Sequence, residues 1–129
     1  MATLERPFAD GRLALCLSSE AERFPFVDFA QALVDKYKGA VVERVGALGT
    51  DEVYWDLRIE DRVLTLHSQR FLGVFLCAAD DPSEELLRRL APFAQEYLRS
   101  WERGSVDYWL KSAWRRARAL VSSARALPE

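Results

Sequence analysis

The chain has 129 residues and a formal net charge of −2, and half of its residues are hydrophobic. This length is typical of one domain that buries about two thirds of its unfolded surface, which is enough for a core without disulfides or metals. The charge gives no nucleic-acid-binding signature, and no apolar run approaches the roughly 18 residues of a membrane span. The N-terminus also lacks a secretory signal pattern, so we expect a cytoplasmic protein without membrane insertion and without a nucleic-acid partner.

The first 11 residues are polar and contain Pro7 and Gly11, which predicts a flexible lead-in. Residues 12–17 form a short apolar run and predict a strand. Apolar side chains then recur at helical spacing, so a helix is expected over residues 25–38, and Gly39 is expected to cap its C-terminus.

Residues 40–78 predict an antiparallel meander of four strands. The clearest is Val53–Ile59, in which apolar and polar residues alternate as they do in a strand with one buried face. The other three strands are expected at Ala40–Val45, Arg62–His67 and Phe71–Ala78.

The register of the meander follows from its turns. With a two-residue turn at 60–61, Tyr54 faces His67. With a three-residue turn at 68–70, Phe71 also faces His67. One face of the sheet is then the core, and the second face carries a mixed set of aromatic and charged side chains: Tyr54, Asp56, Arg58, His67, Phe71 and Phe75.

Half of this second face is apolar, and a face left in water would not have this composition. Something must cover it: the C-terminal helix, a second copy of the chain, or another protein. The six residues are therefore the candidate site for binding a partner or a ligand.

Strong helix signals follow the meander. Asp81 is expected as the N-cap, with Pro82 as the first helical residue and Glu84 as the capping-box partner. Gly104 is expected to end this helix.

A last amphipathic helix is expected over residues 105–125. Its basic side is a second candidate surface, formed by Lys111, Arg115 and Arg118. This surface can bind an acidic partner or pair with the acidic remainder of the chain. The expected fold is α+β: an antiparallel meander of about four strands, plus a short N-terminal strand, packed with three helices in a single domain over residues 1–129.

The residues predict no catalytic group. His67 is the only histidine, its neighbour Ser68 points to the opposite face of the strand, and Asp56 lies one row away. Cys16 and Cys77 lie inside apolar runs and predict free thiols in the core. We therefore expect no cofactor and no metal, and a binding protein rather than an enzyme.

The order strand, helix, strand meander, helix, helix, across about residues 12–121, resembles the architecture of small bacterial immunity-type and effector-chaperone domains. The resemblance implies a non-catalytic module that occludes a protein partner through a sheet face. Effector chaperones usually carry further strands after the second helix, and this chain has none. The alternative is a homodimer that holds a small ligand near Tyr54, Asp56, Arg58 and His67.

Overall fold

The structure, a computed structural model, describes residues 2–101. The chain divides into two compact units, Met1–Leu98 and Arg99–Glu129. The fold described below belongs to the first, apart from residues 99–101 at the end of its last helix. The helix expected over residues 105–125, with Lys111, Arg115 and Arg118, lies outside the described residues, as does Gly104. The single-domain organisation stays a prediction.

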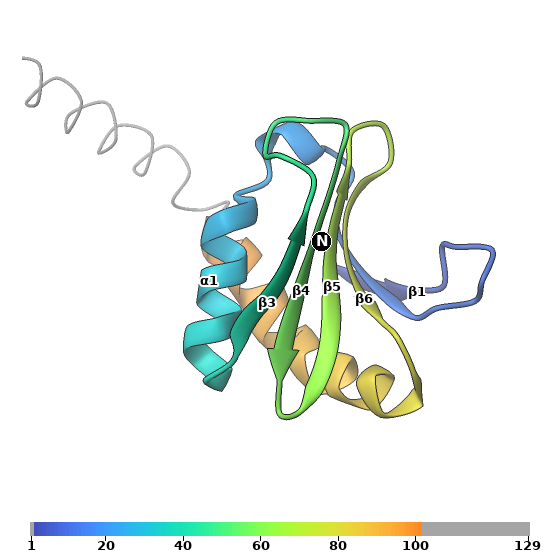
Figure 1. Ribbon diagram of the computed structural model, residues 1–129, viewed down its shortest axis with the longest axis vertical. Helices are drawn as coiled ribbons and strands as arrows, with labels where there is room; N and C mark the ends of the chain where they lie inside the picture. The colour runs from blue at the N-terminus through green and yellow to red at the C-terminus, as the bar shows by residue number, and fades with distance from the viewer. Residues whose placement is uncertain (1, 102–129) are drawn as a thin grey trace, which may run out of the picture. The chain divides into compact units, whose positions relative to one another are not determined.

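The described chain is α+β with an antiparallel sheet, which confirms the expected class. The sheet has six strands in the order β1-β2-β6-β5-β4-β3 (Figure 1). In chain order they are β1 (Thr3–Glu5), β2 (Ala14–Ser18), β3 (Ala40–Val45), β4 (Glu52–Ile59), β5 (Arg62–Gln69) and β6 (Gly73–Ala78). The helical elements are a 3-10 turn η1 (Ala21–Arg23), the helix α1 (Phe26–Tyr37), and a helix over residues 81–101.

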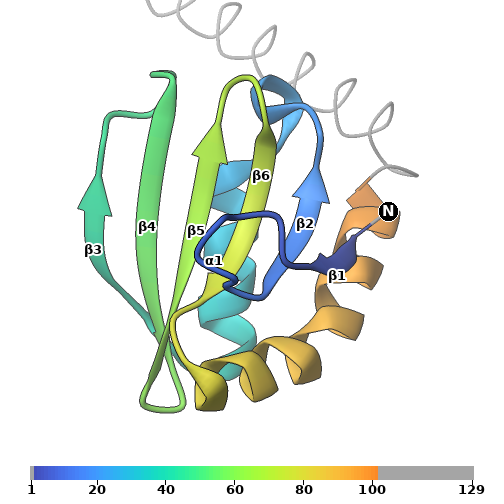
Figure 2. The ribbon, with the colours of Figure 1, turned by 90° about the vertical axis from the view of Figure 1, so that its right-hand side faces the viewer.

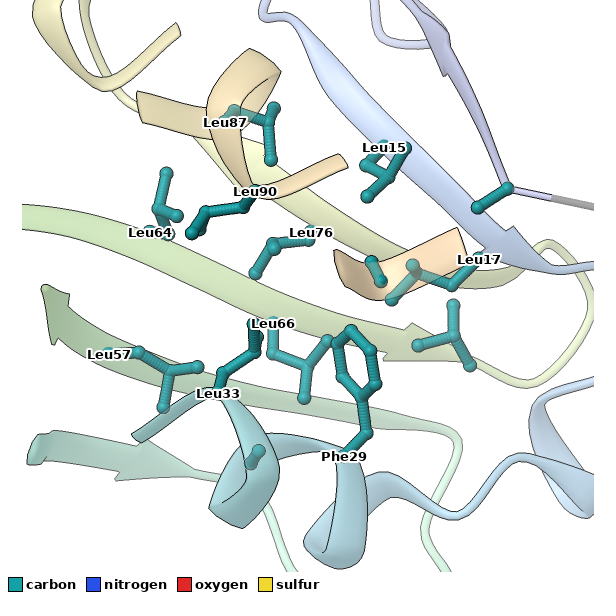
Figure 3. Packing of buried hydrophobic residues seen from close by; sticks show 14 of the residues in the cluster. Leu15, Leu17, Phe29, Leu33, Leu57, Leu64, Leu66, Leu76, Leu87 and Leu90 are labelled. Atoms are coloured by element: carbon teal, nitrogen blue, oxygen red, sulfur yellow. The ribbon is translucent and has the colours of Figure 1, made fainter. Parts of the chain in front are cut away.

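Both helices pack against one face of the sheet, and the core lies between the helices and this face (Figure 2). The apolar stripe of α1 meets the alternating apolar positions of β4 and β5, and leucines of the 81–101 helix meet β2 and β6 (Figure 3). The side chains at the centre of this layer are fully buried: Leu15, Phe29, Leu33, Leu57, Leu64, Leu66, Leu76, Leu86, Leu87 and Leu90. In the described residues, no helix has the length and hydropathy to cross a membrane.

The N-terminal residues differ from the flexible lead-in that the sequence predicts. Thr3–Glu5 form β1, which pairs antiparallel with β2. Ala2 is only 2% exposed, and its carbonyl accepts a hydrogen bond from Gln95 Nε2 at 3.0 Å. A strand of three residues is too short to show a period of two, so its polar sequence gave no strand signal.

The predicted register of β4 against β5 is confirmed. Tyr54 pairs with His67, and Trp55 pairs with Leu66. Glu60 and Asp61 form the turn with φ of 52° and 61°, the left-handed geometry that matches the twist of a tight hairpin.

The predicted register of β5 against β6 is wrong by four residues, because the turn lies two residues later than predicted. His67 pairs with Phe75 and not with Phe71, because the turn occupies residues 70–72. Gly73 begins β6 with φ of +116°, and a Cβ there would meet the Ser18 carbonyl oxygen at 2.1 Å. A shift of an even number of residues preserves the face of each side chain, so Phe75 lies on the predicted face while Phe71 leaves the sheet.

The start of the 81–101 helix and the end of α1 each differ from expectation by one residue. Asp80, and not Asp81, caps the 81–101 helix, since its Oδ1 accepts the Ser83 amide at 2.8 Å. At the end of α1, Lys38 takes the left-handed conformation (φ 54°) expected of Gly39. Glycine is needed at position 39 for a different reason, namely space: a Cβ there would meet the Arg58 carbonyl oxygen at 2.4 Å.

Candidate functional site

Three of the predicted site residues gather on the second face of the sheet, the face opposite the helices. The Tyr54 and His67 rings stack with centroids 4.2 Å apart and an interplanar angle of 15°. Phe75 lies beside His67 at 6.1 Å. The register of β4 against β5 accounts for the contact of Tyr54 with His67 at the centre of this cluster.

A segment that the sequence did not suggest as a cover lies over part of this cluster. Residues 6–12, here called the strap, link β1 to β2 and cross the second face (Figure 2). The Phe8 ring stacks on His67 at 5.8 Å and meets the edge of Phe75 at 5.2 Å. The chain thus covers part of the second face with its own N-terminal segment.

Polar contacts hold the strap in place. Arg6 forms a two-pronged ion pair with Glu84, with Nη1–Oε1 at 2.6 Å and Nη2–Oε2 at 3.2 Å, and Nη1 also donates to the Gly11 carbonyl. The Arg12 guanidinium lies 5.0 Å from the Phe8 ring centroid and pairs with Asp10 at 2.6 Å. These contacts order a segment whose sequence shows no helix or strand pattern.

His67 is enclosed by this arrangement and is 5% exposed. Neither ring nitrogen has a hydrogen-bond partner among residues 2–101. Burial lowers the pKa of His67 below its ordinary value of 6.5; the Glu52 carboxylate partly opposes this shift, and Arg12 adds to it. The imidazole is therefore held neutral near pH 7.

The remaining predicted residues lie apart from this cluster. Asp56 accepts a hydrogen bond from Thr65 Oγ1 at 2.7 Å, and Arg58 is exposed. Phe71 is 83% exposed in the turn at 70–72. Cys77 is buried on the second face as a free thiol, and burial raises its pKa to about 11.

A cleft of about 580 Å³ opens at one end of the sheet, where three segments meet. They are η1 with the start of α1, the β3–β4 loop over residues 46–51, and the β5–β6 turn (Figure 1). The floor of the cleft is apolar and buried, formed by Phe24, Phe26 and Val53. Sequence reasoning missed this cleft, because no single segment contains it.

Exposed apolar side chains line this cleft or lie next to a lining residue in the chain. Val27 and Leu48 line it and are 43% and 55% exposed. Phe71 and Leu72 directly follow the lining residue Arg70 and are 83% and 55% exposed. These four are more than half of the seven large apolar side chains exposed within residues 2–101, so the exposure is concentrated at one end. We call the cleft and these four residues the apolar tip.

Charged groups tie the parts of the apolar tip together. The Arg70 guanidinium pairs with Glu22 and with Asp51, each at 3.4 Å, and the Arg70 amide donates to the Asp51 carbonyl at 2.9 Å. Asp28 also lines the cleft and makes no ion pair within the described chain. The apolar tip therefore carries three carboxylates and one guanidinium and is acidic.

The loop that carries Leu48 has a defined conformation. Thr50 Oγ1 donates to the Ala47 carbonyl at 2.6 Å and lies 3.2 Å from the Glu52 carbonyl. Gly46 has φ of +84°, and a Cβ there would meet the Glu52 carbonyl oxygen at 2.4 Å. Leu48 is therefore held outward by its own loop.

Comparison with known proteins gave no match to this chain among protein-family models, curated proteins or solved structures. Within the part of the chain that the structure describes, no three His, Cys, Asp or Glu side chains gather as a metal site would require. The candidate site is therefore described by its geometry alone.

Proposed function

We propose that this protein is a non-catalytic protein-binding module and that the apolar tip is its binding surface. The observation that carries the proposal is that exposed Val27 and Leu48 line one cleft, and that exposed Phe71 and Leu72 directly follow its lining residue Arg70. Contiguous exposed apolar patches are uncommon on monomeric proteins, and they mark interaction surfaces. Apolar anchors that enter such a cleft supply most of the free energy of a protein interface.

The partner of this surface is a protein segment with an apolar side chain next to lysine or arginine. The apolar side chain fills the cleft over Phe24, Phe26 and Val53. The basic group lies beside the unpaired Asp28 carboxylate. Charge complementarity of this kind favours a basic partner and disfavours an acidic one.

The apolar tip replaces the second sheet face as the proposed surface, because Phe8 of the strap already packs on His67 and Phe75 of that face. Occlusion of a partner, as in immunity-type or chaperone-type proteins, is the biological role that we propose for the tip. Its shape supports this role, since a cleft with a protruding Phe71 can enclose a partner's side chain.

A displayed library of short random peptides, selected against the full chain, tests this proposal. We expect the selected peptides to combine an apolar residue with Lys or Arg. Labelled versions, measured by fluorescence anisotropy, should bind Phe71→Glu and Leu48→Glu about tenfold more weakly or worse, the effect of losing one anchor. Both side chains are exposed, so circular dichroism should show unchanged folding.

Arg58→Glu is the matched control, because Arg58 is exposed on β4 away from the tip. Peptides that bind all three variants equally, or peptides rich in Asp and Glu, contradict the proposal. Light scattering of the free protein distinguishes a second copy as the occupant. A dimer that dissociates in Phe71→Glu would show that the tip binds another copy of this chain and would overturn the proposed partner.

A further inference from the structure

The His67 enclosure is unusual because a titratable ring is buried without any partner for its nitrogens. Its walls are the Tyr54 ring on β4, the Phe75 ring on β6 and the Phe8 ring of the strap. The neutral ring fits this apolar space, but an imidazolium there would have two buried N–H donors without acceptors.

Of the three walls around His67, the strap is the one that can move away at the lowest cost in free energy. Tyr54 and Phe75 belong to central strands that are hydrogen-bonded on both sides. Phe8 lies in a segment outside the ladder, within a turn closed by one bond from the Gly11 amide to the Phe8 carbonyl at 3.0 Å. Water therefore reaches His67 when the strap moves, while the sheet remains intact.

We propose that the strap is an acid-released cover, which leaves the second face when His67 gains a proton and then exposes the apolar surface of Ala14, Phe75 and Cys77. This inference goes beyond the proposed function, because it concerns the second face and not the apolar tip.

The titratable and charged groups around His67 come from each neighbouring element. Glu52 and Tyr54 lie on β4, Cys77 on β6, Cys16 on β2, and Asp10 and Arg12 on the strap. Of these, the Glu52 carboxylate favours the imidazolium and Arg12 disfavours it, while burial has the largest effect on the His67 pKa and lowers it. The Tyr54 and Phe8 rings attract the imidazolium weakly by cation–π interaction. This attraction reduces the effect of His67 protonation on closure of the strap without reversing its direction.

The sign follows from this lowered pKa. The closed strap favours neutral His67, so closure is most stable above the ordinary pKa of 6.5 and weakens as the pH falls below it. Each unit by which closure lowers the pKa increases the open population by about tenfold at low pH. The Arg6–Glu84 ion pair persists through this pH range, because the Arg6 hydrogen bond lowers the pKa of Glu84 below 4.5.

NMR of the full chain tests the inference. The amides of Gly11 and Arg12 bond within the strap, to the Phe8 carbonyl and to Asp10 Oδ1. We expect their hydrogen exchange, corrected for intrinsic rates, to accelerate as the pH falls below 6.5, while β5 amides do not change. His67→Phe keeps an aromatic ring without a titrating group and should abolish the acceleration.

The effect of the strap on the pKa of His67 gives a second measurement. Phe8→Ala opens the enclosure, so the pKa of His67, followed by its ring protons, should rise towards 6.5. Val63→Ala, on the same face of β5 but outside the aromatic cluster, is the control and should leave this pKa unchanged. An equal His67 pKa in wild type and Phe8→Ala, or equal pH dependence of strap exchange in wild type and His67→Phe, overturns the proposal.

Discussion

At the scale of single residues, the adjacent carboxylates Asp80 and Asp81 differ in their roles at the start of the 81–101 helix. The Ser83 hydroxyl and amide both bond to Asp80, and these bonds lower its pKa below the ordinary value of 3.8. Asp81 is the first residue of the helix and is exposed. Sequence reasoning chose Asp81, because both residues are good caps and Pro82 is tolerated anywhere in the first turn.

We expect Asp80→Ala to lower the urea midpoint of unfolding near neutral pH, and Asp81→Ala to change it much less. A lowered carboxyl pKa stabilises the fold above its ordinary value of 3.8, and this contribution is lost as the pH falls through the lowered pKa. The midpoints of wild type and Asp80→Ala should therefore converge in acid. Equal effects of the two substitutions at neutral pH would contradict this assignment of the cap.

Residues whose environment depends on a distant segment could not be placed from the sequence. The stack of Tyr54 on His67 was predictable, because one tight turn and a strict alternation define it. The contact of Phe8 with His67 was not, because it joins the strap to the middle of the chain. The tip cleft was missed for the same reason, since Val27, Leu48 and Phe71 come from three separate elements.

At the scale of elements, hydrophobic patterns predicted strands well and their ends poorly. The β4–β5 hairpin has polar residues in its turn, so its ends are visible in the sequence. The β5–β6 turn contains Phe71 and Leu72, which resemble strand residues although both are exposed. Their exposure is the same property that makes them candidates for binding.

The end of α1 offers a test at this scale. Lys38 has a left-handed backbone, which strains a residue with a Cβ. We expect Lys38→Gly to stabilise the protein by about 0.5–1 kcal/mol, since glycine adopts this conformation without a steric cost. Chemical denaturation measures the change. Lys36→Gly, inside α1, is the control and should destabilise by a similar amount.

At the scale of the whole described fold, the two faces of the sheet contribute unequally to stability. The helices bury Leu66 completely on one face, whereas Val63 on the second face stays partly exposed. We expect Leu66→Ala to cost about 2–5 kcal/mol, the range for a large side chain removed from a packed core. Val63→Ala should cost about 1 kcal/mol or less. Comparable losses in urea denaturation would mean that the second face is as tightly packed as the core.

The central position of β6 also determines when the sheet can be completed. Strands β3 to β6 pair with their neighbours in sequence, but β2 pairs only with the short β1 and with β6, which lies far along the chain. Contacts between distant segments form slowly, because a long loop must close first. During synthesis, β2 and the residues before it must therefore wait for β6 to emerge. The strap reaches His67 only after that step, so its docking belongs to the end of folding.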